Sequence, residues 1–112
     1  METLLNGEFH EFLNALIHMY TDVKREILFV NDMVQSDIKA MDLMISILQE
    51  YNSLSKAEFI YQLSNFSTCL RYFKKDAMLQ RSQKLENLIS FAESFENNCI
   101  FKYDTVFIHN IY

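Results

Sequence analysis

Apolar residues in the first third of the chain recur in alternating steps of four and three positions. This spacing places their side chains on one face of an α-helix, because a helix repeats every 3.6 residues. The apolar positions are Phe9, Leu13, Leu16, Tyr20, Val23, Ile27, Val30 and Val34. The pattern predicts an amphipathic helix over about residues 8–34.

The same spacing resumes after Asp37 and predicts a second helix over about 36–51. Its apolar positions are Met41, Met44, Leu48 and Tyr51. A single helix over 8–51 would need a second copy of the chain to cover its apolar stripe, as in a coiled coil. A turn at the polar stretch NDMVQSD would instead let two helices cover one another. We favour the turn, although the stretch contains neither Gly nor Pro.

Two further helices follow. Ser55 and Glu58 stand three positions apart, as in a capping box, and mark the start of a helix over about 55–74. Its apolar positions are Phe59, Leu63, Phe66, Leu70 and Phe73. The rhythm then slips by one residue, which predicts a break and a last helix over about 77–96. The apolar positions of that helix are Met78, Leu85, Leu88, Ala92 and Phe95.

The segment 99–112, CIFKYDTVFIHNIY, follows a different pattern. Alternate residues from Phe101 to Phe107 are aromatic or β-branched, as in a strand, although a helical stripe through Phe101, Thr105 and Ile108 also fits. Because Ile, Val, Thr, Phe and Tyr prefer pleated surfaces, we expect an extended tail with β character. The sequence as a whole predicts one all-α domain over 1–112, an antiparallel bundle of three or four helices that ends in this tail.

Composition narrows the choice of function. The chain has 112 residues with one Gly, no Pro and a net charge of −5. The scarcity of turn residues argues against a β-sandwich and against a Gly-rich phosphate loop. The negative charge argues against general affinity for nucleic acid or anionic lipid. No signal peptide or membrane span is indicated, so we expect a soluble, cytoplasmic protein.

Positive charge is concentrated in the stretch RYFKKDAMLQRSQK, residues 71–84. Residues 1–50 carry nine acidic and three basic side chains, whereas residues 51–112 carry six acidic and seven basic. On one continuous helix, the basic residues Arg71, Lys74, Lys75 and Arg81 would share about a third of the circumference. We interpret this patch as solvated or as a complement to the acidic first half. The alternative is contact with a phosphate backbone.

No catalytic, metal or cofactor motif is recognisable. His10 and His18 are eight positions apart, too far along a helix to share one metal ion. Cys69 stands in STCLRY, which matches no nucleophile signature. Methionines suit adaptable binding grooves, but the spacing of Met33, Met41 and Met44 favours a place in the core. We therefore expect a protein that is not an enzyme and uses no cofactor.

These observations indicate a protein-binding module. In size, charge and lack of catalytic signal, the chain resembles small acidic helical proteins that occupy a surface on another protein, such as viral or phage inhibitors, immunity proteins and adaptors. The predicted contact residues are the apolar anchors of the tail, Phe101, Tyr103, Phe107, Ile108 and Tyr112. The alternative is a homodimeric regulator that contacts nucleic acid through the basic patch at 71–84.

Overall fold

The computed structural model of the chain describes the backbone of residues 2–111 and the side chains of residues 10–31 and 33–98. Within this part, the regular elements are all helical: α1 (Glu2–Val30), η1 (Asp32–Val34), α2 (Gln35–Gln49), η2 (Tyr51–Ser53), α3 (Lys56–Phe73) and α4 (Gln83–Ile111). The all-α prediction is therefore confirmed.

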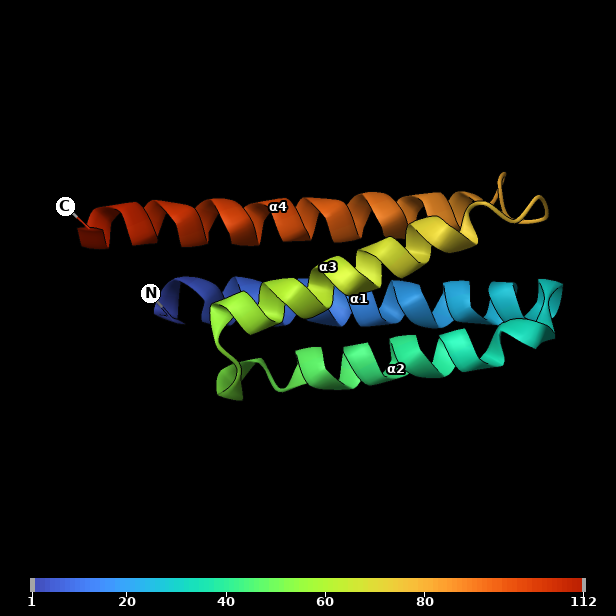
Figure 1. The fold of residues 1–112 in the computed structure, drawn as a ribbon, viewed down its shortest axis with the longest axis horizontal. Helices are drawn as coiled ribbons and strands as arrows, with labels where there is room; N and C mark the ends of the chain where they lie inside the picture. The colour runs from blue at the N-terminus through green and yellow to red at the C-terminus, as the bar shows by residue number, and fades with distance from the viewer. Residues whose placement is uncertain (1, 112) are drawn as a thin grey trace.

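The four α-helices run alternately up and down (Figure 1). Helix α1 packs against α2 and α4, and α3 packs against the same two helices from the other side. The molecule is elongated, 51 × 23 × 20 Å, with its long axis along the helices. Among the described side chains, one core cluster of buried apolar residues runs between the four helices.

The apolar stripes become this core. In the described part of α1 the buried apolar positions are Leu13, Leu16, Tyr20, Val23 and Ile27. In α3 all five stripe residues are buried: Phe59, Leu63, Phe66, Leu70 and Phe73. Steps of four and three keep side chains on the one helix face that neighbouring helices can cover, so the sequence pattern directly indicated which side of each helix faces inward.

The chain turns between residues 30 and 35, which was the favoured reading of the polar stretch. Helix α1 ends at Val30, and the side chain of Asn31 caps the short helix η1 by accepting a hydrogen bond from the Met33 amide at 3.0 Å. An Asn side chain that satisfies a free amide in this way can end a helix without Gly or Pro. The predicted cap at Ser55 is also present, since its Oγ accepts a hydrogen bond from the Glu58 amide at 3.1 Å.

The last helix differs from the prediction at both ends. It begins at Gln83 rather than 77, because Ser82 caps it by accepting a hydrogen bond from the Leu85 amide at 3.1 Å. It also continues to Ile111, so the expected extended tail is wrong for the backbone of residues 99–111. Each residue added to an existing helix gains a hydrogen bond without a new nucleation cost, and this outweighs the β preference of the segment.

Candidate protein-interaction surface at one end of the bundle

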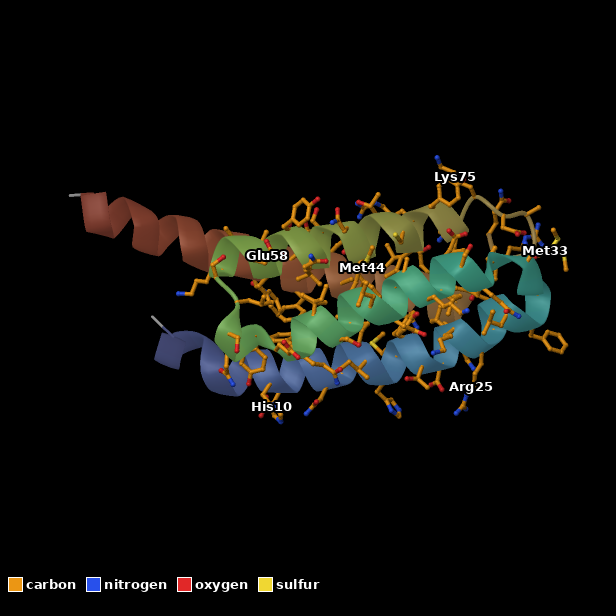
Figure 2. The ribbon with its side chains drawn as sticks, turned by 60° about the horizontal axis from the view of Figure 1, so that its bottom comes forward. His10, Arg25, Met33, Met44, Glu58 and Lys75 are labelled. Atoms are coloured by element: carbon orange, nitrogen blue, oxygen red, sulfur yellow. The ribbon has the colours of Figure 1, made fainter. Side chains whose placement is uncertain are left out.

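Two connections lie at the same end of the bundle. The up-and-down topology brings the α1–α2 turn and the α3–α4 loop, residues 74–82, together at the right-hand end of Figure 1. Neighbouring helices in a bundle lie about 8–10 Å apart, so one partner could touch both connections at once. Figure 2 shows Met33 of the turn and Lys75 of the loop at this end, whereas His10 and Glu58 lie toward the other.

This end carries the three most exposed large apolar residues of the described part of the chain. Phe29 is 92% exposed, Met33 is 88% exposed and Met78 is 74% exposed. We call these three residues the bundle-end surface. A freely accessible aromatic side chain presents about 150–250 Å². The three side chains stand on the last turn of α1, the α1–α2 turn and the α3–α4 loop, at the same end of the bundle, so one partner surface could cover all of them.

Local structure explains why these side chains point outward. Phe29 follows the buried Ile27 by two residues, which is about 200° around the helix. Met78 precedes Leu79, which is 1% exposed and fixes the loop to the core. Met33 and Met78 also occupy equivalent places in their connections, because each donates its amide proton to an Asn or Asp side chain two residues earlier, Asn31 at 3.0 Å and Asp76 at 2.8 Å.

The spacing argument was wrong for two of these residues. Met41 is buried and Met44 packs against the core as expected, but Met33 lies on the short helix η1 and is exposed. Met78 was assigned to the stripe of the last helix, yet Leu79 takes the core position. The one-residue slip in the apolar spacing after Phe73 was the signal in the sequence that α3 ends there and that the helical pattern does not apply to Met78.

The predicted basic patch does not form one helix face, because α3 ends at Phe73. Two of its residues turn toward α4. Arg71 Nη1 lies 3.0 Å from Glu93 Oε1, and Lys74 forms an ion pair with Glu86. The acidic partners are thus residues of α4 and not of the first half of the chain. Both pairs are partly solvated, so each contributes about 0–1 kcal/mol.

The other two basic residues belong to the loop. Lys75 is exposed, and its Nζ lies 5.5 Å from the centre of the Tyr72 ring, within the range of a cation–π contact. Arg81 is exposed at the end of the loop, just before the Ser82 cap. Exposed cations and an exposed aromatic ring therefore accompany the bundle-end surface.

The predicted tail contacts lie outside the described side chains. The backbone of Phe101, Tyr103, Phe107 and Ile108 belongs to α4, and Tyr112 lies beyond the described residues altogether. Their role in binding a partner stays a prediction.

A second polar cluster joins α1 to α2. The Tyr20 hydroxyl donates a hydrogen bond to Asp42 Oδ1 at 2.7 Å, and Lys24 Nζ lies 3.1 Å from Asp42 Oδ2. Burial of Tyr20, then its hydrogen bond to Asp42 and the charge of that carboxylate, raise the pKa of the phenol well above its ordinary value. The Tyr20 hydroxyl therefore stays protonated, and its hydrogen bond to Asp42 links α1 to α2.

Cys69 lies in an environment unlike that of an activated nucleophile. Partial burial, and then the negative charge of Asp37, raise the pKa of its thiol. Reactive cysteines need the opposite shift, which nearby positive charge provides. Both described histidines, His10 and His18, are exposed on α1.

Among the described residues, no group of three or more His, Cys, Asp or Glu side chains is placed to hold a metal ion. No helix in that part of the chain is both long enough and apolar enough to cross a membrane. Comparisons with protein-family models, with curated proteins and with solved structures found no match to this chain.

Proposed function

We propose that this chain is a non-enzymatic protein-interaction module of the inhibitor, adaptor or immunity-protein type, and that the bundle-end surface is its main contact. The observation that carries the proposal is that Phe29, Met33 and Met78, the most exposed large apolar residues of the described part, all lie at one end of the bundle. Large apolar side chains near full exposure are costly to hydrate, and they supply the anchors that dominate interface energy.

The form of the surface suits a partner segment rather than a small molecule. It projects from the end of an elongated bundle, whereas small-molecule sites are concave and enclose their ligand. A stable interface buries about 800 Å² on each partner, more than three side chains provide. Phe29, Met33 and Met78 therefore form the centre of the interface, and the neighbouring polar residues of the two connections form its rim.

The test is selection of binding peptides from a displayed random library on the immobilised full chain. Enriched peptides are then measured against the triple variant Phe29→Ser, Met33→Ser, Met78→Ser. We expect their affinity to fall by about tenfold or more, because the anchors lose their apolar contact. The matched control is Leu43→Ser with Tyr61→Ser, which removes exposed apolar groups from the sides of α2 and α3.

The proposal is wrong if no peptide is enriched, or if the enriched peptides bind the triple variant as tightly as the original chain. It is also wrong if only the control variant loses binding. Circular dichroism of both variants confirms that any loss of binding does not come from unfolding.

The apolar residues of 101–112 are a second contact region in this proposal. Truncation after Asn98 tests it with the same peptides. We expect the truncated chain to keep its cooperative unfolding, because the truncation leaves every residue of the described core in place. Weaker binding by the truncated, folded chain would assign part of the interface to this segment.

A further inference from the structure

We infer that the segment bound at the bundle end is acidic, with bulky apolar side chains among its Asp and Glu residues. This inference rests on the proposed function and names the chemistry of the partner. Residues 71–84 carry five basic side chains and one acidic, for a net charge of +4. Since the whole chain carries −5, the remaining residues carry −9. The α3–α4 loop and its flanks are thus a local positive region on a negative molecule.

Part of this charge is neutralised within the bundle. Glu93 pairs with Arg71, and Glu86 pairs with Lys74. The remaining cations of the stretch are Lys75, Arg81 and Lys84, all exposed and without an ion pair to any described carboxylate. Lys84 lies in the first turn of α4, where the partial positive charge of the helix end adds to its own.

The available cations and the apolar anchors lie in the same part of the fold. Met78 stands between Lys75 and Arg81 in the loop, and Figure 2 places Met33 at the same end as Lys75. An acidic segment could set its carboxylates against these cations while its apolar side chains cover Met33 and Met78. Arg81 offers two parallel N–H donors to one carboxylate, and the flexible methionines adapt to differently shaped anchors.

A peptide fits this surface better than a nucleic acid does. A protein that makes about 6–10 contacts to a phosphate backbone uses more cations than the three available here. The charge of −9 on the remaining residues, which include Asp32 and Asp37 close to Met33 in the sequence, repels a long polyanion, whereas a short acidic segment can keep its carboxylates at the α3–α4 loop. A phosphate backbone would also make no apolar contact with Phe29, Met33 and Met78.

The test uses two labelled synthetic peptides with identical Leu and Phe positions, one with Glu and the other with Lys between them. Fluorescence anisotropy with the full chain gives their affinities at about 50 mM and about 300 mM salt. We expect the Glu peptide to bind about tenfold more tightly at the lower salt concentration, and the difference to shrink at the higher one.

Charge-reversed variants locate the effect. Arg81→Glu should abolish most of the preference for the Glu peptide. Lys56→Glu, at the opposite end of the bundle, changes the net charge equally and should leave the preference intact. A preference that falls equally in both variants would reflect only overall charge and would overturn the inference.

The remaining outcomes separate this inference from the proposed function. The two peptides could bind equally well and both lose binding in the triple variant of Phe29, Met33 and Met78. That result would overturn the inference that the partner is acidic, but it would support the bundle-end surface as an interaction surface. Binding of neither peptide, together with failure of the library selection, would overturn both. Tighter binding of a single-stranded oligothymidine than of the Glu peptide would overturn the inference in favour of nucleic acid.

Discussion

Two phenylalanine sites, one toward each end of the bundle, have opposite environments. Toward the end where α3 begins, the Phe12 ring lies 5.7 Å from Phe91 and 5.2 Å from Phe95, and Phe95 lies 5.9 Å from Phe59. These rings come from α1, α3 and α4 and pack against one another. At the other end, Phe29 projects from the last turn of α1 and is almost fully exposed.

The contrast shows that neighbours, more than residue type, decide whether a side chain stabilises the fold. Phe95 is 1% exposed because two other helices supply rings on either side. Phe29 stands near the end of α1, on the side away from Ile27 and the core. We interpret the first group of rings as structural, and the second site as free to bind a partner.

The largest expected effect on stability comes from removing one of the packed rings, Phe95. Phe95→Ala should lower the free energy of unfolding by about 3–5 kcal/mol, because it removes a fully buried ring and leaves a cavity. Phe29→Ala is the matched control and should change stability by less than about 0.5 kcal/mol. Urea denaturation followed by circular dichroism measures both. Similar losses in the two variants would show that Phe29 is also packed, which contradicts the comparison.

A smaller effect on stability is expected at the Tyr20–Asp42 contact, which lies between the two ends of the bundle. Tyr20→Phe should cost about 1.5–3 kcal/mol near neutral pH, because it removes a hydrogen bond to a charged carboxylate and leaves the ring in place. The control is Thr21→Val, since the Thr21 hydroxyl only bonds to the carbonyl of Ile17 within its own helix. Equal losses in the two variants would mean that the contact does not fix α1 against α2.

The same residue predicts how stability changes with pH. The pKa of Tyr20 is raised in the folded state, chiefly by burial, so the folded protein keeps a proton that the unfolded chain loses above about pH 10. This contribution is complete below about pH 10 and is lost as the pH rises toward the folded-state pKa, by up to about 1.4 kcal/mol per pH unit. Denaturation measured from neutral to alkaline pH should show a steeper decline for the original chain than for Tyr20→Phe.

The sequence predicted the interior of the molecule better than its ends. Regular steps of four and three identified the buried residues of α1 and α3, because packing and periodicity act together there. Met33 and Met78 lie in connections where a cap or a single core anchor, such as Leu79, decides which residue points inward. The bundle-end surface could not be predicted, since it depends on two connections 40 residues apart meeting at one end.

The smallest expected effect on stability sharpens the comparison at the bundle end. Glu86→Gln with Glu93→Gln removes two partly solvated ion pairs and should cost at most about 2 kcal/mol in total. The same change frees Lys74 and Arg71, so the acidic synthetic peptide should bind several-fold more tightly at low salt. Anisotropy and urea denaturation of the one variant separate the two effects. Unchanged peptide binding would place these cations outside the interface, because their release adds positive charge only at the α3–α4 side of the bundle.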